Sequence, residues 1–404
     1  MSFDLRTGKP AWLIGKPRIA RHQKLDRNIH SNVVVVGGGI SGALLGYRLT
    51  NLGMQVAIID SRQVGAGSTA ASTAILSYEA DVNLGELIQK IGRTPAVRAY
   101  RAGIEAIDLI GKTVKKLGGG CDFRRTRSLY LASSRKDVEL LEREYAVRKK
   151  YKFRVKLIWR DELATKYSLN SPCAILNEGA AEVNPLKLTQ ALVQRARKKG
   201  LRVFVGTRVT SYRPEGRESI LITENGFEVR ANHVVFATGY ETQQFLKQPS
   251  VKLKSSYAIA SKPMRLRSKD RFPVIWETAR PYLYVRATAD SRIIAGGEDV
   301  DFVDEKRRDR LLPAKTRVLE KKIRKLMPDI RWKLATAWTG TFAETKDGLP
   351  YIGRHKDFPR ALFALGYGGN GITFATIASM IVPDLIRGRT NPDARIFRFD
   401  RRSE

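Results

Sequence analysis

The feature that most constrains the fold is the stretch of residues 33–60, where a strand, a turn, a helix and a second strand follow one another. Residues 33–36 are four consecutive valines, a pattern typical of a strand buried on both faces of a parallel sheet. Residues 56–59 form a second apolar strand, and residues 40–52 between the two have helical character. Two strands joined by a helix predict a parallel βαβ unit, and hence an α/β fold.

The turn between the first strand and the helix contains Gly37, Gly39 and Gly42, which fit the pattern G-x-G-x-x-G. The first glycine permits the tight bend, the second lets the backbone approach a pyrophosphate, and the third lets the helix pack on the strand. The helix opens with Ile40 and Ser41, so its N-terminal N–H groups and its dipole are expected to face the phosphates. This turn predicts a dinucleotide site.

The second strand ends at Asp60, and a run of small residues follows it. A carboxylate at this position accepts hydrogen bonds from a ribose. The small residues suit a backbone that lies against a flat ligand while offering hydroxyl and N–H donors. A flexible linker is the alternative, but alanine is frequent here and the nucleotide motif is close. The expected ligand contacts in this stretch are Ser61, Gly67, Ser68, Thr69, Thr73, Ala74 and Ile75.

The length of 404 residues leaves room for two or three domains with a buried core. The two cysteines, Cys121 and Cys173, form no C-x-x-C pattern, which argues against a disulfide framework and fits a reducing cytoplasm. The first residues lack the apolar core of a signal peptide. Residues 372–386 are apolar but contain Pro383 and are too short for a membrane span, so we expect a buried helix and a cytoplasmic protein.

The formal net charge of +33 could indicate nucleic acid, a membrane surface or anionic substrates as partners. Lysine and arginine are spread along the whole chain, which favours a solvated basic surface instead. The densest run, residues 306–325, keeps Val318, Leu319, Ile323 and Leu326 at helical spacing, with the basic side chains largely between them. We therefore expect an amphipathic helix there.

The rest of the chain alternates between helical and extended patterns. Residues 1–30 form a polar arm that Trp12 and Leu13 could attach to the body. A strand at 233–236 ends in Ala237, Thr238 and Gly239, and a glycine cluster precedes the last apolar helix. That cluster predicts a second anion site at a helix N-terminus. The other expected elements are helices at 95–117, 137–150 and from Pro185, and strands at 128–133, 202–205, 208–212, 257–261, 274–276, 282–286 and 292–296.

Four features together resemble the family of D-amino-acid oxidase, glycine oxidase and monomeric sarcosine oxidase. They are the opening fingerprint, the small-residue run 67–74, the strand ending at 237–239, and Asp347-Gly348-Leu349-Pro350 followed by the glycine-rich residues 366–371. The resemblance implies a Rossmann-like FAD-binding domain with an antiparallel substrate domain, of the glutathione-reductase-2 type. It adds the following residues to the expected FAD contacts: Val209, Ala237, Thr238, Gly239, Gly353, Gly366, Tyr367, Gly368, Gly369, Asn370, Gly371 and Ile372.

The resemblance also implies a discontinuous arrangement of the domains. Residues 1–30 are expected to form the arm, residues 31–90, 165–250 and 335–404 the FAD-binding domain, and residues 91–164 and 251–334 the substrate domain.

The family chemistry implied by the resemblance is oxidation of a C–N bond. Hydride passes from the carbon beside a substrate amine to flavin N5, giving an imine that water hydrolyses, with O2 or an unknown molecule as electron acceptor. The helix that starts near Gly371 could stabilise the anionic reduced ring. Gly340 stands where some relatives attach FAD through a cysteine, so noncovalent FAD is expected.

Substrate contacts remain open between two alternatives. Tyr282, Tyr284 and Arg286 look like the family strand that can hold a substrate carboxylate, a task for which a guanidinium fork is suited. Glu298 and Asp299 could instead attract a cationic amine. The first alternative predicts an amino acid as substrate and the second a plain amine.

Two other classes of function are alternatives to amine oxidation. Some relatives of this fold oxidise modified nucleosides in tRNA, and this chain is strongly basic, but it has no appended RNA-binding module. A nonenzymatic nucleic-acid-binding protein would not need the closing FAD motifs. The four histidines form no ligand-spaced cluster, so no metal site is expected.

Overall fold

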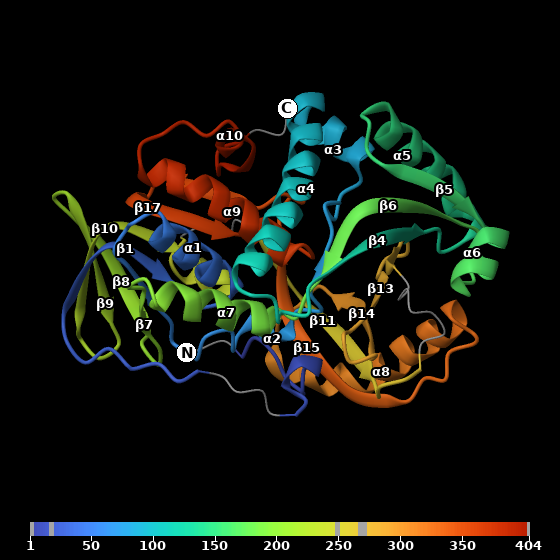
Figure 1. Cartoon of the computed structure of the whole chain (residues 1–404), viewed down its shortest axis with the longest axis horizontal. Helices are drawn as coiled ribbons and strands as arrows, with labels where there is room; N and C mark the ends of the chain where they lie inside the picture. Colours follow the sequence, from blue (N-terminus) through green and yellow to red (C-terminus); the bar gives the residue numbers. More distant parts are fainter. Residues whose placement is uncertain (1–3, 16–19, 247–250, 266–272, 402–404) are drawn as a thin grey trace.

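The computed structural model describes residues 4–15, 20–246, 251–265 and 273–401. Its strands form two large sheets, which lie side by side with helices α4 and α9 in front of and between them (Figure 1). The helices are α1 Ile40–Asn51, α2 Ser68–Ala71, α3 Leu84–Ile91, α4 Arg93–Lys116, α5 Val138–Lys150, α6 Arg160–Tyr167, α7 Pro185–Arg197, α8 Glu305–Leu326, α9 Gly371–Ile386 and α10 Ala394–Phe397. Short 3-10 turns lie at η1 Ala11–Leu13, η2 Arg135–Asp137 and η3 Gly239–Gln244.

The first sheet contains the predicted βαβ unit. Its strands follow the order β16-β17-β10-β1-β2-β7, with the hairpin β8–β9 added to β10. Strand β1 runs parallel to β2 and β10, which confirms the α/β class. The bounds are β1 Ile29–Val36, β2 Val56–Ile59, β7 Arg202–Phe204, β8 Val209–Glu215, β9 Glu218–Thr223, β10 Glu228–Phe236, β16 Tyr351–His355 and β17 Phe358–Leu365.

The four valines of β1 are buried on both faces of this sheet, as their pattern predicts. Val33 and Val35 belong to the core that contains the apolar face of α1. Val34 and Val36 belong to a separate core on the opposite face, beneath the β8–β9 hairpin. Neither face of this part of β1 is therefore open to water.

The second sheet is built mainly from antiparallel neighbours. Its order is β15-β11-β14-β13-β12-β4-β6-β3, and β5 pairs with β6. Helix α8 covers one face with Leu319, Ile323 and Leu326, whereas Val318 from the same run is 40% exposed. The bounds are β3 Ile75–Leu76, β4 Arg124–Leu131, β5 Val155–Trp159, β6 Cys173–Glu182, β11 Lys252–Ser261, β12 Val274–Glu277, β13 Leu283–Ala287, β14 Ile293–Val300 and β15 Leu334–Glu344.

Sheet membership differs from the expected domain segments at three strands. Strands β3, β6 and β15 belong to the second sheet, although their residues fall in segments expected for the FAD-binding domain. The chain therefore changes from one sheet to the other inside the predicted segments.

Residues 5–9 of the N-terminal arm are held against the second sheet. Backbone N–H groups of Thr339 and Thr341 in β15 donate to the carbonyls of Thr7 and Leu5. The indole N–H of Trp12 donates to the carbonyl of Ser72 at 2.7 Å, and its side chain is buried. Trp12 thus attaches the arm to the body, as expected from the sequence.

Candidate active site

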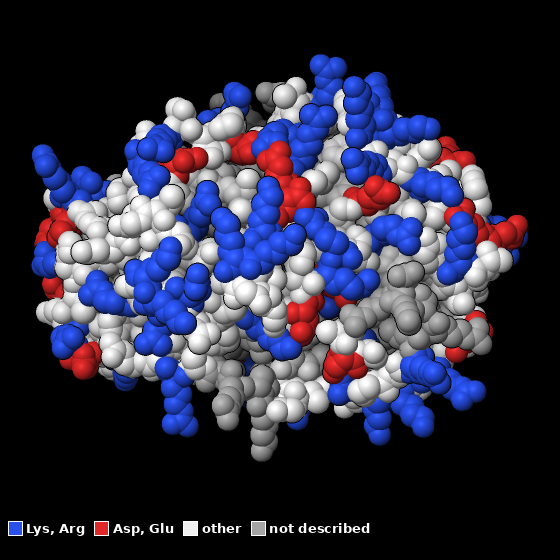
Figure 2. Space-filling view, viewed as in Figure 1, with Lys and Arg blue, Asp and Glu red and all other residues white. Residues whose placement is uncertain are grey.

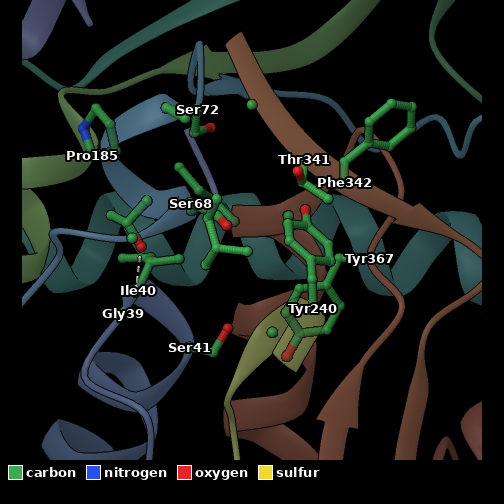
Figure 3. Close-up of a pocket in the computed structure, with 18 of the residues that line it drawn as sticks. Gly39, Ile40, Ser41, Ser68, Ser72, Pro185, Tyr240, Thr341, Phe342 and Tyr367 are labelled. Atoms are coloured by element: carbon green, nitrogen blue, oxygen red, sulfur yellow. Dashed lines mark hydrogen bonds between the residues drawn. The ribbon is translucent and has the colours of Figure 1, made fainter. Parts of the chain in front are cut away.

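A long cavity runs between the two sheets and is lined from both. At one end it is formed by the turn after β1 and the start of α1, and at the other by the inner face of β11, β12 and β13. Figure 3 shows Ser68, Thr341, Tyr240 and Tyr367 gathered around one space in its middle. Segments that are far apart in the sequence therefore share one site.

The glycine turn forms a cradle at the first end of the cavity. Gly37 has φ +113°, and a Cβ on Gly42 would lie only 1.8 Å from the carbonyl oxygen of Gly37. Helix α1 starts at this turn without a side-chain cap on its N-cap residue, Gly39. The hydroxyl of Thr69 accepts from the N–H of Ile40 at 2.9 Å, an interaction drawn in Figure 3. A helix N-terminus whose N-cap residue has no side chain, behind a glycine turn, fits a pyrophosphate.

Asp60 lies beside this turn at the end of β2. Its two carboxylate oxygens accept from the backbone N–H groups of Gly38 at 2.5 Å and Arg62 at 2.7 Å. Burial raises the pKa of Asp60, and the two N–H donors oppose that rise. Because a carboxylate oxygen can accept more than one hydrogen bond, both oxygens retain capacity for a ribose hydroxyl.

The small-residue run passes along the cavity with its carbonyls turned away from it. The carbonyl of Ala71 accepts from the indole N–H of Trp338 at 2.8 Å, and that of Ser72 accepts from Trp12. Side chains of the arm and the second sheet therefore fix this backbone. Ser68, which lines the cavity, has a buried hydroxyl with no hydrogen-bond partner in the described structure.

Arg286 also donates to carbonyls of this run, and its position corrects the role predicted for it as a substrate contact. One guanidinium nitrogen donates to the carbonyls of Thr73 at 3.1 Å, Ala74 at 2.7 Å and Val183 at 3.0 Å. The side chain is only 1% exposed and is not part of the cavity wall. Alternation does put it on the same sheet face as Tyr282 and Tyr284, but residues 73–74 cover it. It is therefore not placed to hold a substrate carboxylate.

The start of α9 closes the middle of the cavity. Asn370 precedes the helix and donates from its amide to the carbonyl of Glu79 at 2.7 Å. The Asp81 carboxylate accepts from the N–H of Gly369 at 2.7 Å, and burial raises its pKa. The hydroxyl of Tyr367, a residue 6% exposed, is buried without a hydrogen-bond partner in the described structure. Residues 79–81 thus hold the glycine loop in place.

The far end of the cavity is the inner face of the second sheet. The register places Trp276, Tyr284, Gly296, Ala258 and Trp338 in one row across β12, β13, β14, β11 and β15. A Cβ on Gly296 would lie 2.4 Å from the Tyr284 hydroxyl, so the glycine makes room for that ring. Aromatic walls with a small floor leave space for a substrate.

The two neighbouring acidic residues singled out in the sequence, Glu298 and Asp299, have different surroundings in the structure. Glu298 pairs with Lys315 at 3.1 Å and with Lys322 at 2.7 Å, both on α8. Asp299 instead has a buried carboxylate oxygen without a hydrogen-bond partner in the described structure, and burial raises its pKa to about 6. Of these two carboxylates, Glu298 has cationic partners within ion-pair distance among the described residues and Asp299 has none.

Most of the residues singled out from the sequence come together in the cavity wall. Gly42, Ala74, Gly353 and Arg286 do not line it. Gly42 acts through helix packing, as expected from the fingerprint, and Ala74 follows the wall in a left-handed conformation, with φ +57°. The lining residues are Gly37, Gly39, Ile40, Ser41, Asp60, Ser61, Gly67, Ser68, Thr69, Thr73, Ile75, Val209, Ala237, Thr238, Gly239, Tyr282, Tyr284, Gly366, Tyr367, Gly368, Gly369, Asn370, Gly371 and Ile372.

Several lining residues were not expected from the sequence. Tyr240 follows the Ala-Thr-Gly strand end directly, which is a signal that sequence reasoning could have used. Trp276, Arg280 and Phe342 carry no local motif, because their roles follow from which strands become neighbours. The wall also contains Arg62, Ser72, Ser77, Glu79, Asp81, Pro185, Arg208, Glu241, Ser256, Gly340 and Thr341.

Among the described residues, no group of three or more His, Cys, Asp or Glu side chains is arranged to hold a metal ion. None of the described helices combines the length and apolar character needed to cross a membrane.

Residues 32–385 match the family model for FAD dependent oxidoreductases, so the chain belongs to this family and is an FAD-dependent oxidoreductase. Its cofactor is FAD, and the glycine cradle, the start of α1 at Gly39 and the unpartnered Ser68 and Tyr367 hydroxyls fit that group.

The chain is similar to several individual members. It is 26% identical to glycine oxidase of Bacillus subtilis over 92% of this chain and 98% of that protein. It is 24% identical to gamma-glutamylputrescine oxidoreductase of Escherichia coli over 92% of this chain and 87% of that protein. The crystal structure of glycine oxidase from Geobacillus kaustophilus has a TM-score of 0.79 at 20% identity, covering 92% of this chain and 99% of that one. The structural likeness supports the shared fold.

Proposed function

We propose that this protein oxidises the C–N bond of a small amine, using noncovalently bound FAD. The observation that carries the proposal is the single cavity that joins the glycine turn of the first sheet to the aromatic face of the second. Glycine oxidase and gamma-glutamylputrescine oxidoreductase among its relatives support a nitrogen-bearing substrate. Both cysteines are buried outside the cavity wall, and Gly340 lines it, which supports noncovalent binding.

The FAD contacts follow from the wall of the cavity. The turn 37–42 and the start of α1 would hold the pyrophosphate, Asp60 the ribose, and residues 366–372 the ring. Bound there, FAD would supply the hydride acceptor for oxidation of the amine to an imine. The positive end of α9, which begins at Gly371, would stabilise negative charge on the adjoining end of the ring.

The substrate would lie against Tyr282, Tyr284 and Trp276. Aromatic faces attract alkylammonium groups, and burial beside the ring excludes water. Asp299 stands behind this wall with an unpartnered carboxylate oxygen, and Asp81 lies in it. Two acidic groups near the aromatic wall favour an amine without a carboxylate.

An amino acid is the second candidate substrate, because Arg280 lines the cavity. Its guanidinium lies 4.9 Å from the centre of the Tyr282 ring and donates to the carbonyl of Asp81 at 3.3 Å. Its remaining donors could receive a carboxylate at the rim. Arg280, rather than the buried Arg286, is therefore the residue to test for this role.

An anaerobic flavin-bleaching assay tests the proposal. Purified protein should show a flavin spectrum, and one or more members of a panel of primary, secondary and polyamine substrates should bleach it. The panel also includes glycine, sarcosine and proline, which carry a carboxylate. Arg280→Met should leave bleaching by plain amines unchanged and weaken that by amino acids about ten- to a hundredfold if Arg280 holds the carboxylate. A flavin that no amine or amino acid reduces would refute C–N oxidation.

The chain would divide into two functional units around this cavity. We assign FAD binding to the sheet containing β1 and substrate binding to the sheet containing β13. The discontinuous segments expected from the sequence support this division, with β3, β6 and β15 joining the substrate unit.

A further inference from the structure

A second, separate groove lies at the N-terminal end of α4. It is formed between that helix and residues 392–401, and its volume is about 1310 Å³. None of its lining residues belongs to the cavity between the sheets. In Figure 1 this end of α4 lies at the same edge of the molecule as α10, away from the turn after β1. Nothing in the proposed amine oxidation uses this groove.

All six cationic side chains of the groove are arginines, and three of them make ion pairs. Arg398 contacts the carboxylate of Asp400 at 3.2 Å. Arg98 makes a two-point contact with Asp393, with both nitrogen–oxygen distances at 2.7 Å. Arg401 makes a similar contact with Asp347 at 2.7 and 2.9 Å. These pairs fix the C-terminal segment against the body and so build the walls of the groove.

Three further arginines have no such partners. Within the described ranges, no acidic side chain lies within 4.0 Å of the guanidinium groups of Arg93, Arg101 or Arg395. Arg93 and Arg101 are separated by about two helical turns and therefore share one face of α4, with the buried Val97 between them. All three are exposed. The groove also contains Asp393 and Asp400, but these carboxylates pair with Arg98 and Arg398. The positive charges of the three exposed arginines are therefore left for an anion in the groove to offset.

The composition of the walls indicates the kind of anion. Guanidinium groups match the geometry of phosphate oxygens with two parallel hydrogen bonds, which lysine cannot provide. The groove also contains the apolar side chains of Ile91, Pro95 and Ile396 and the ring of Tyr151. Its volume far exceeds that of inorganic phosphate. We propose that this groove binds a small organic molecule that carries a phosphoryl group, with the arginines receiving the phosphate and the apolar wall its organic part.

Calorimetric titration of the holoenzyme tests this proposal. Saturating FAD first fills the flavin's own site, and inorganic phosphate, pyrophosphate and ATP are then titrated without divalent cations at one fixed ionic strength. ATP should bind saturably and more tightly than inorganic phosphate. The triple variant Arg93→Gln, Arg101→Gln, Arg395→Gln should bind ATP at least about tenfold more weakly, because charged hydrogen bonds are lost.

A matched variant separates the groove from the general surface charge. Figure 2 shows Lys and Arg over the whole visible face, so removal of any three cations lowers the overall field. Arg195→Gln, Arg197→Gln, Lys198→Gln removes the same charge from the exposed end of α7 and should change ATP affinity less than about twofold. The single variant Arg101→Gln, at an exposed helix position, should already weaken ATP binding. It keeps the proposal testable if the triple variant does not fold.

Three results would overturn the proposal. The first is no saturable binding of any of the three probes to holoenzyme. The second is equal weakening in the α4 and α7 variants, which would assign binding to the net charge. The third is binding of a single-stranded oligonucleotide that depends on the three arginines while ATP and pyrophosphate do not bind, which would assign the groove to nucleic acid.

Discussion

Arg286 is a buried cation whose donors hold backbone instead of substrate. Its contacts to the carbonyls of Thr73 and Ala74 continue the series in which Trp338 and Trp12 hold the carbonyls of Ala71 and Ser72. Four consecutive carbonyls are thereby directed away from the cavity. Ala71, Ser72 and Thr73 of this stretch line the cavity.

Arg286→Met should therefore destabilise the protein and weaken FAD binding together. Loss of a fully buried, hydrogen-bonded guanidinium typically costs roughly 3–5 kcal/mol of unfolding free energy. Urea unfolding and FAD titration of the apoprotein measure the two effects. Arg280→Met serves as the control, because this exposed rim arginine should leave unfolding unchanged. Normal stability and FAD affinity in Arg286→Met, with a raised KM for amino acids only, would restore the carboxylate role.

Asp299 gives a pH-dependent prediction. Burial raises its pKa from 3.8 to about 6 in the folded protein, against a hydrogen bond from Ser256 and with help from the Glu344 and Asp81 charges. Between these two pH values the folded state holds more protons than the unfolded state, so this group lowers stability as pH rises from about 4 to about 6. Above about pH 6 the decrease in the free energy of unfolding caused by this group has reached its full size.

Asp299→Asn should accordingly stabilise the protein at neutral pH by at most about 3 kcal/mol, and not below about pH 4. Thermal unfolding of parent and variant from pH 5 to pH 8 should show a difference that grows and then levels off. Asp301→Asn is the matched control, since its carboxylate pairs with Lys252 at 2.7 Å and its pKa is lowered. A constant difference across this pH range would mean that Asp299 is not held in its neutral form.

At the scale of elements, the contact between α1 and the turn after β1 is the tightest in the site. The Gly42 position has no space for a side chain, because a Cβ would lie 1.8 Å from the carbonyl oxygen of Gly37. Gly42→Ala should push the start of α1 away from the turn and disrupt the phosphate cradle. We expect FAD affinity to fall by about tenfold or more, measured by fluorescence titration.

Gly85→Ala in α3 is the corresponding control. Its added Cβ would meet Glu144 at an ordinary 3.4 Å, so the substitution should stabilise the helix by about 0.5–1 kcal/mol and leave FAD affinity unchanged. If the two variants bind FAD equally well, close packing at Gly42 is not what shapes the cradle.

The sequence was most informative where a function depends on local chain geometry. The turn 37–42, the buried valines of β1 and the small-residue run could be predicted because glycine conformations and burial periods are local properties. The buried position of Arg286 could not be predicted. Alternation along a strand shows on which face of the sheet a side chain lies, but not which other segment covers it. Trp276 and Phe342 reach the cavity only through long-range strand neighbours, which no window of the sequence contains.

The basic residues show the same limit of what can be predicted from the sequence alone. The run 306–325 does form the predicted amphipathic helix, α8, whose Lys315 and Lys322 neutralise Glu298. The arginine groove, in contrast, combines α4 with a segment nearly three hundred residues later. Charge density along the chain therefore did not locate the place where unpaired cations converge.

At the scale of the whole molecule, the cavity is the place where the two sheets meet. FAD bound across it would contact residues of both sheets, such as Asp60 beside the first and Gly340 in the second. A ligand that binds only the native state stabilises it by RT ln(1 + [L]/Kd), about 2.7 kcal/mol at a hundredfold excess over Kd. FAD should therefore stabilise the two sheets as one unit.

Removal of FAD should lower the unfolding temperature and split or broaden the unfolding transition. Without the ligand, the sheets remain joined by the N-terminal arm and the packing of α4 on α9, so each can begin to unfold at its own temperature. Differential scanning calorimetry of holoprotein, apoprotein and apoprotein reconstituted with FAD measures this. Reconstitution with FMN is the control, because FMN lacks the adenosine part that would reach Asp60. A transition of unchanged temperature and width in the apoprotein, or equal stabilisation by FMN and FAD, would show that the ligand does not link the sheets through the turn after β1.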